Sequence, residues 1–173
     1  MIPVVAPRFD IVECNNELER TFIEAMHERS ETDMWYPDAW MWDDRVVLLV
    51  CVADRTPGYG VVLRSLRVDF DGQMVCFGPD ETHQLATDLN PARPGVFALS
   101  GQSVAELADA AANWLQRELR RPIMRQEWDL LDAHGVTPRL WVLADSGEVL
   151  AACGQRSTEF GPPDRGTPIT QSP

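Results

Sequence analysis

The segment Val46–Val52 is the feature of this sequence that most constrains its fold. Its seven residues are all apolar, and four of them are valine. A continuous β-prone run of this length predicts a strand that is buried on both faces. Such a strand needs neighbouring strands and a cover, so the rest of the chain is expected to build a sheet around it.

Two short turns predict that this sheet is antiparallel. Asp71-Gly72 joins two β-prone segments and is typical of a type I′ hairpin turn. Asp145-Ser146-Gly147 joins a second pair of β-prone segments in the same way. The predicted strands are Val46–Val52, Val61–Phe70, Gln73–Phe77, Val96–Leu99, Ile123–Trp128, Leu140–Ala144 and Glu148–Cys153.

Two helices are predicted from their capping residues and apolar stripes. Asn16 with Glu19 indicates a helix over residues 17–29, and Ser103 with Glu106 indicates a second helix that Pro122 ends. The chain is therefore expected to be an α+β protein with an antiparallel sheet of about five to seven strands covered by two helices. Residues 1–154 are predicted to form one domain, and residues 155–173 a disordered C-terminal tail.

The charged residues exclude several kinds of chemistry. The chain has 27 acids and 15 bases, a net charge of −12, and every base is arginine. Without lysine there is no Schiff-base, PLP or P-loop lysine chemistry. The acidity argues against a nucleic-acid partner, and no apolar run predicts contact with a membrane. The three histidines and four cysteines lack metal-ligand spacing, so we predict no metal, no cofactor and a cytoplasmic, reduced protein.

The negative charge is concentrated near the N-terminus, beside a group of aromatic residues. Residues 1–44 contain 11 acids and three arginines. Tryptophan and tyrosine are favoured anchors of protein interfaces, and acids steer a basic partner. We therefore predict a non-catalytic, chaperone-like or immunity-like domain that binds a basic protein through its first helix and the segment 33–44. An alternative is that the aromatic residues cap an open end of the core. The predicted partner-binding residues are Asp33, Trp35, Tyr36, Asp38, Trp40, Trp42, Asp43 and Asp44.

Four arginines near the end of the second helix form a candidate anion clamp. They are Arg117, Arg120, Arg121 and Arg125, and guanidinium groups bind carboxylates and phosphates in two-pronged fashion. The alternative is that they complement the helix dipole and pair with Glu118 and Glu127.

The order of elements and the acidity resemble those of type III secretion chaperones and YbjN-like peptide-binding proteins. The resemblance covers about residues 16–154 and implies that the chain binds a protein client. The predicted strands at 96–99 and 123–128 depart from that family pattern of helix, three strands, helix and two strands.

Two other functions stay open at this point. The first is an enzyme whose site assembles from distant residues, with Arg64, Arg67, His83 and Glu127 as candidates. The second is a structural subunit that forms a homodimer, with the acidic N-terminal face of one copy against the Arg117–Arg125 cluster of the other.

Overall fold

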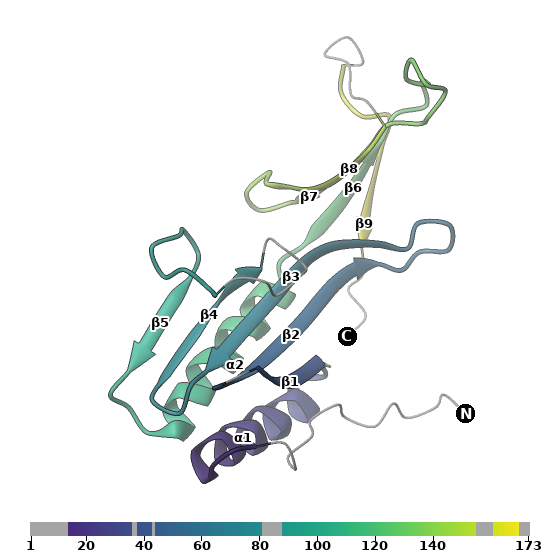
Figure 1. Cartoon of the computed structure of the whole chain (residues 1–173). Helices are drawn as coiled ribbons and strands as arrows, with labels where there is room; N and C mark the ends of the chain where they lie inside the picture. The colour runs from purple at the N-terminus through teal and green to yellow at the C-terminus, as the bar shows by residue number, and fades with distance from the viewer. Residues whose placement is uncertain (1–13, 36–37, 43, 81–87, 155–160, 170–173) are drawn as a thin grey trace, which may run out of the picture. The chain divides into compact units, whose positions relative to one another are not determined.

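The computed structural model describes residues 14–35, 38–42, 44–80, 88–154 and 161–169. It confirms the α+β class and both predicted helices, α1 (Glu17–Asp33) and α2 (Val104–Leu119). The strands form two sheets, not the single sheet predicted from the sequence, with five strands in one and four in the other (Figure 1). The described residues divide into two compact units: unit 1 takes residues from 1–52 and 64–118, and unit 2 takes residues from 53–63 and 119–172.

The five-stranded sheet belongs to unit 1 and has the order β1-β2-β3-β4-β5. Its strands are β1 (Asp38–Trp42), β2 (Arg45–Asp54), β3 (Val61–Phe70), β4 (Met74–Asp80) and β5 (Phe97–Ser100). The apolar run that the sequence analysis began with is β2, which lies between two neighbours as predicted. It is not buried on both faces along its whole length, because Leu49 is half-buried and Cys51 is exposed. The ends of β2 and β3 that adjoin residues 55–60 belong to unit 2.

Both helices pack on one face of the five-stranded sheet. The ring of Phe22 in α1 stacks on Phe70 in β3 with 4.2 Å between centroids. Trp114 in α2 packs against Phe77 in β4 at 5.3 Å. These side chains are almost fully buried, which places the apolar core of unit 1 between the helices and this sheet face.

The capping residues of both helices act as their sequence predicts. The Asn16 side chain accepts a hydrogen bond from the Glu19 backbone N–H at 3.0 Å, and Glu19 in turn accepts one from the Asn15 N–H at 2.7 Å. Ser103 and Glu106 exchange equivalent bonds at the start of α2. One backbone N–H in the first turn of each helix, that of Glu19 and that of Glu106, therefore has a side-chain acceptor.

The four-stranded sheet belongs to unit 2 and has the order β8-β7-β6-β9. Its strands are β6 (Ile123–Glu127), β7 (Arg139–Leu143), β8 (Val149–Cys153) and β9 (Arg165–Ile169). Trp128, Leu140 and Val142 form an apolar cluster with Met124. The turn 145–147 joins β7 to β8 as a hairpin, with Gly147 at a φ of 74°.

Three predicted features of the fold need correction. Residues 38–42, predicted as loop, form the edge strand β1, which pairs with β2 from Asp38 to Trp42. The turn after Phe70 is not type I′, because that turn needs two successive positive φ angles and only Gly72 among its described residues has one. Asp71 instead accepts hydrogen bonds from the N–H groups of Gln73 and Met74.

The third correction concerns the end of the chain. The sequence predicts disorder from residue 155 onward, but Arg165–Ile169 pairs antiparallel with β6 as β9. The strand contains Gly166 and Pro168, which are unfavourable inside a sheet and explain why the composition gave no strand signal. Proline is tolerated here because β9 is an edge strand, one side of which needs no hydrogen-bond donors.

Candidate functional site

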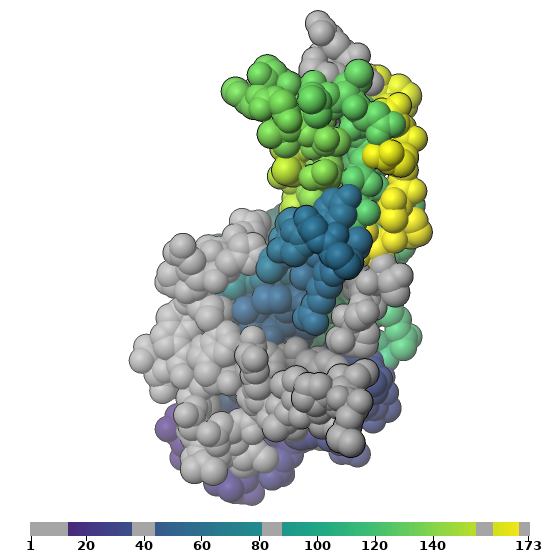
Figure 2. Space-filling view, turned by 90° about the vertical axis from the view of Figure 1, so that its right-hand side faces the viewer, coloured from purple at the N-terminus to yellow at the C-terminus, as the bar shows by residue number. Residues whose placement is uncertain are grey.

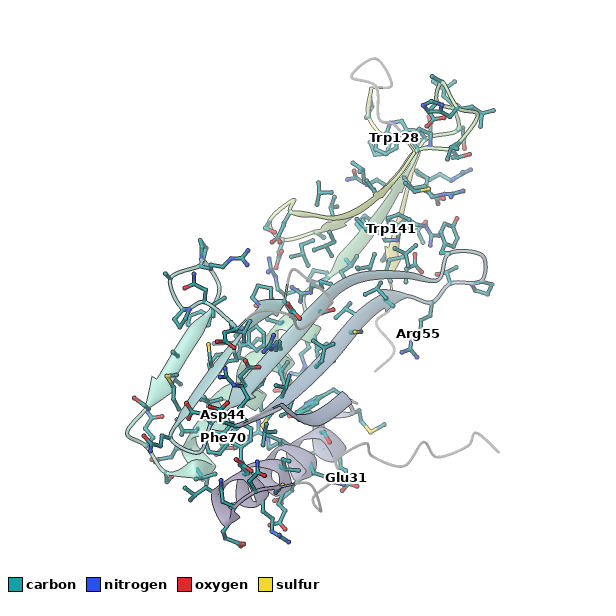
Figure 3. All side chains as sticks on the ribbon, in the orientation of Figure 1. Glu31, Asp44, Arg55, Phe70, Trp128 and Trp141 are labelled. Atoms are coloured by element: carbon teal, nitrogen blue, oxygen red, sulfur yellow. The ribbon has the colours of Figure 1, made fainter. Side chains whose placement is uncertain are left out.

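Four glutamates line the outer face of α1. Glu17, Glu24, Glu28 and Glu31 follow one another by seven, four and three residues, spacings that keep them on one side of the helix. All four are exposed, and the Glu31 side chain extends into solvent (Figure 3). We call these four residues the acidic face of α1.

Few bases lie near the acidic face. Among the described residues, Arg20 pairs with Glu17 at 3.6 Å, and the His27 ring, which is charged only when protonated, lies 3.9 Å from Glu31. Arg29, on another side of the helix, is engaged by Asp109 at 2.6 Å and by Asp33 at 3.6 Å. The acidic face therefore presents a strong local negative potential to solvent.

The predicted partner-binding segment 33–44 divides into residues with different roles. Trp35 is buried, with 2% of its surface exposed, and so takes the core-capping role that the sequence left open as the alternative. Asp33 accepts a hydrogen bond from Gln116 in α2 and is largely covered. Asp44 is exposed beside Arg45. Asp38, Trp40 and Trp42 have their backbone in β1, whereas Tyr36 and Asp43 lie outside the described residues.

The four arginines of the predicted anion clamp do different things. Arg125 is buried and pairs with Asp54 at 2.7 Å and with Glu127 at 3.4 Å, the second pair as the alternative prediction expected. Arg121 pairs with Asp145 at 2.8 Å. Arg117 and Arg120 are exposed and have no ion pair with any described residue. The anion-binding capacity of the cluster is thus reduced to Arg117 and Arg120, and Arg125 instead pairs with an acid inside unit 2.

The residues considered for catalysis are held by partners or lie outside the described chain. Arg64 pairs with Glu118 at 2.9 Å, and Arg67 pairs with Asp69 at 2.6 Å inside unit 1. Glu127 accepts hydrogen bonds in unit 2, and His83 lies outside the described residues. In the described part of the chain, no three histidine, cysteine or acidic side chains come close enough to hold a metal ion.

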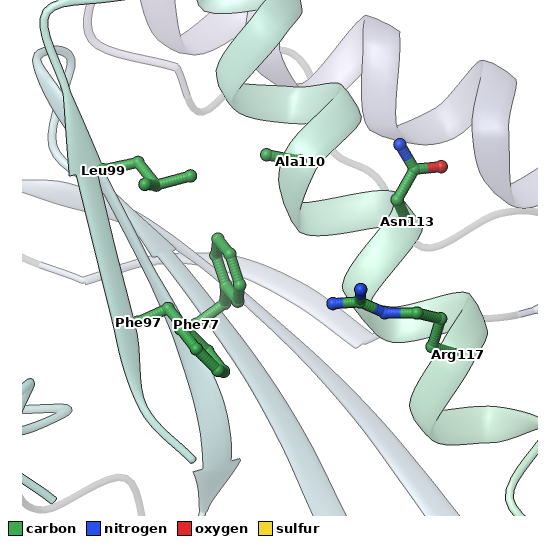
Figure 4. A pocket seen from close by; sticks show the side chains of 6 residues that line it. All are labelled: Phe77, Phe97, Leu99, Ala110, Asn113 and Arg117. Atoms are coloured by element: carbon green, nitrogen blue, oxygen red, sulfur yellow. The ribbon is translucent and has the colours of Figure 1, made fainter. Parts of the chain in front are cut away.

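A groove lies between the edge strand β5 and the helix α2 in unit 1. Its volume is about 300 Å³, and its apolar lining comes from Phe77, Phe97, Leu99 and Ala110. Asn113 and Arg117 supply its polar side, one helical turn apart on α2 (Figure 4). Phe97 is 48% exposed, so the groove opens to solvent along β5.

Unit 2 contains a buried ionic and aromatic cluster around β6 and β7. Asp54 accepts hydrogen bonds from Arg125 at 2.7 Å and from the Trp141 indole at 2.8 Å. The Arg125 guanidinium lies 3.7 Å from the centre of the Tyr59 ring, and the Tyr59 hydroxyl donates to Glu127 at 2.9 Å. Figure 2 shows residues 53–63, in blue, beside the green and yellow strands of this unit. Every acid in the cluster has a base or a donor beside it, which is typical of a structural network.

Burial raises the pKa of both Asp54 in unit 2 and Asp69 in unit 1, but the net shifts of the two carboxyl groups have opposite signs. Burial raises the pKa of Asp54, but hydrogen bonds from Thr56, Trp141 and Arg125 outweigh it and lower the pKa to about 2. In unit 1, burial is the larger effect at Asp69 and holds its pKa above the ordinary value despite the Arg67 partner. The surroundings of Asp54 therefore stabilise its ionised form, whereas the surroundings of Asp69 disfavour its ionised form.

The groove and the buried cluster were both missed by the sequence analysis. The groove joins residues of β4, β5 and α2, and no spacing along the chain indicates that a half-exposed Phe97 will face an unpaired Arg117. The cluster joins Asp54 to Arg125 and Trp141, which are 71 and 87 residues away. The signal that was available is the extra charge in an otherwise β-prone segment at Asp54 and Arg125.

Comparisons of the chain with models of known protein families, with curated proteins and with solved structures give no significant match. No family therefore lends its site residues or its activity to this chain. The resemblance to secretion chaperones stays a prediction from the order of the elements. No helix of the described residues is long and apolar enough to cross a membrane.

Proposed function

We propose that the protein is a non-catalytic binding domain that holds a basic protein partner on the acidic face of α1 and on the neighbouring segment 33–44. The observation that carries the proposal is the set of four exposed glutamates on one side of one helix. The nearest described bases are 3.6 Å and 3.9 Å from two of them.

The electrostatics of the helix favour a cationic partner. Like charges three or four residues apart, such as Glu24, Glu28 and Glu31, destabilise a helix by about 0.2–0.5 kcal/mol per pair. Arginine or lysine side chains of a partner offset that repulsion and are steered toward it from a distance. Leu18 and Met34, at the two ends of α1, are 49% and 53% exposed and supply apolar contact area.

The test compares two double variants that lose the same charge. Glu24→Gln with Glu28→Gln removes two charges from the acidic face, and Asp129→Asn with Glu148→Gln removes two exposed charges from unit 2. Each is used to capture partners from a native lysate, and the affinity of a captured protein is then measured with purified components at low and high salt.

We expect the α1 double variant to weaken binding about tenfold and to flatten its salt dependence, because screening acts on exposed charges. The unit 2 control should bind as the unaltered protein does. Equal binding by both double variants, or a captured partner that is acidic, would contradict the proposal.

Self-association is a second candidate, because Arg117 and Arg120 lack partners among the described residues and would suit the acidic face of another copy. Sedimentation equilibrium of the full chain tests it. A dimer that Glu24→Gln with Glu28→Gln dissociates supports this candidate, and a monomer at high concentration excludes it.

A further inference from the structure

We infer that the groove between β5 and α2 is a second binding site, which takes an extended peptide segment carrying an apolar side chain and a carboxylate two residues apart. The peptide would add to the five-stranded sheet as a sixth strand beside β5. The inference is independent of the proposed partner at the acidic face of α1, since it rests on other residues.

The first step is that β5 is an edge strand. Among the described strands it is the last in the order β1-β2-β3-β4-β5, and β4 is its one described neighbour. In an edge strand every second residue points its N–H and C=O outward, so two of the four residues Phe97–Ser100 offer these groups to another chain. Native edges are commonly protected by charges, proline or a bulge, and the sequence Phe-Ala-Leu-Ser has no charge and no proline.

The second step is that the edge adjoins a prepared apolar surface. Phe97 and Leu99 pair with Phe77 and Val75 of β4 and share the sheet face on which α2 packs. Phe97 contacts Phe77 at 5.6 Å between ring centres, yet it is 48% exposed. Alternate side chains of a strand added beside β5 would lie on this face, next to Phe97 and Leu99 at the open side of the groove.

The third step is the charge at one end of the groove. Arg117 points from α2 toward Phe77 and Phe97 (Figure 4) and has no ion pair among the described residues. Asn113 points away from Phe97 and Leu99 (Figure 4), and its oxygen accepts a hydrogen bond from Arg29 at 2.6 Å. The Arg117 guanidinium is thus the charged donor on an otherwise apolar wall, and it is complementary to a carboxylate.

The order of these groups sets the sequence that would bind. Leu99 lies across from Ala110, and Phe97 lies across from Arg117 (Figure 4). Because side chains of a strand alternate, two successive residues on one face are two positions apart. The peptide should therefore place an aliphatic residue near Leu99 and a glutamate or aspartate near Arg117, with one residue between them.

The experiment uses the full chain and an array of seven-residue, β-prone peptides. Each carries leucine or valine and glutamate two positions apart, in either order, and each has a twin with glutamine in place of glutamate. Fluorescence anisotropy measures binding to the unaltered protein, to Arg117→Gln, and to Arg120→Gln as the matched control. Both arginines are exposed and have no ion pair with a described residue, but only Arg117 lines the groove.

We expect the best glutamate peptide to bind about tenfold more tightly than its glutamine twin, and Arg117→Gln to remove that difference. Arg120→Gln should change binding less than twofold, and methylation of the peptide's backbone nitrogens should abolish it. Four results would overturn the inference. Two are that no array member binds better than a scrambled peptide, and that both arginine variants lose binding equally. The third is unchanged binding of the N-methylated peptides, which would indicate a site for small carboxylates. The fourth is a dimer that Arg117→Gln dissociates, which would make a second copy of the chain the occupant.

Discussion

The two sheets of this protein are covered in different ways. The five-stranded sheet of unit 1 is covered by two helices that bury apolar stripes, with Phe22 on Phe70 and Trp114 on Phe77. In the described part of unit 2 there is no complete helix, and one face of its sheet holds Asp54, Tyr59, Arg125 and Glu127 in a buried ionic cluster. A sheet without a helical cover can thus be closed by paired charges and an aromatic ring.

The two units differ in what stabilises them and in whether they carry a proposed binding surface. Unit 1 gains its stability from apolar contacts, which respond weakly to pH and salt, and it carries both proposed binding surfaces. Unit 2 has a smaller apolar cluster, and one face of its sheet is closed by charges that are already paired, which leaves them unavailable for a ligand. Changes in pH or in single charges should therefore act more strongly on unit 2, and loss of apolar volume more strongly on unit 1.

The largest effect is expected in the apolar core of unit 1. Phe22→Ala removes a fully buried ring that stacks on Phe70 and should lower the free energy of unfolding by about 4 kcal/mol. Leu18→Ala, on the same helix but 49% exposed, is the control and should cost less than about 1 kcal/mol. Urea unfolding measures the free energy of unfolding of both variants. An equal decrease in the two would contradict the placement of the unit 1 core around Phe22.

Breaking the ionic cluster should have the next largest effect. Asp54→Asn removes the closer of the two anions of buried Arg125, leaving Glu127 at 3.4 Å, and should cost about 3 kcal/mol. Replacing both residues, Asp54→Leu with Arg125→Met, should restore most of that loss because no charge stays buried alone. Hydrogen exchange should locate the loss in β6 and β7, and a loss confined to unit 1 would contradict the comparison.

Acid should destabilise unit 2 before unit 1. The folded pKa of Asp54, about 2, lies below its unfolded value of about 4, so the stability it contributes is complete above pH 4 and is lost as pH falls toward 2. The folded pKa of Asp69 is raised, so its protonation as pH falls favours the folded unit 1. Hydrogen exchange at stepwise lower pH should show β6 and β7 opening first; simultaneous opening of β3 would count against this.

The smallest effect is expected at the end of α1. Met34 adopts a left-handed conformation with φ of 60°, which favours glycine, and its side chain is 53% exposed. Met34→Gly should raise the free energy of unfolding by about 0.5–1 kcal/mol, because relief of backbone strain exceeds the lost contact. Thermal unfolding measures this, and a lower melting temperature would show that Met34 packs usefully.

The sequence predicted the elements better than their assembly. Capping pairs at Asn16 and Ser103 and the apolar run of β2 are local signals, and the helices and inner strands followed from them. The edge strand β9 was missed because Gly166 and Pro168 are unfavourable inside a sheet, and β1 was missed because Pro37 directly before it indicates a break in regular structure.

The candidate sites were predicted in part. The acidic face of α1 follows from helical spacing, but the burial of Trp35 does not, since the same residues suit an interface or a core. The clamp of four arginines failed as a unit because Arg125 lies on a strand and meets Asp54, 71 residues away. Which of the four arginines pair with acids depends on contacts between residues far apart in the chain. Arg117 has no ion pair with a described residue and lines the groove.

The most direct test of the central claim is carbodiimide labelling of carboxyl groups, with and without a captured partner. We predict that Glu24 and Glu28 on the acidic face of α1 become protected in the complex, while Asp129 and Glu148 in unit 2 are labelled as before. Protection of the unit 2 carboxyls with full labelling of Glu24 and Glu28 would contradict the account.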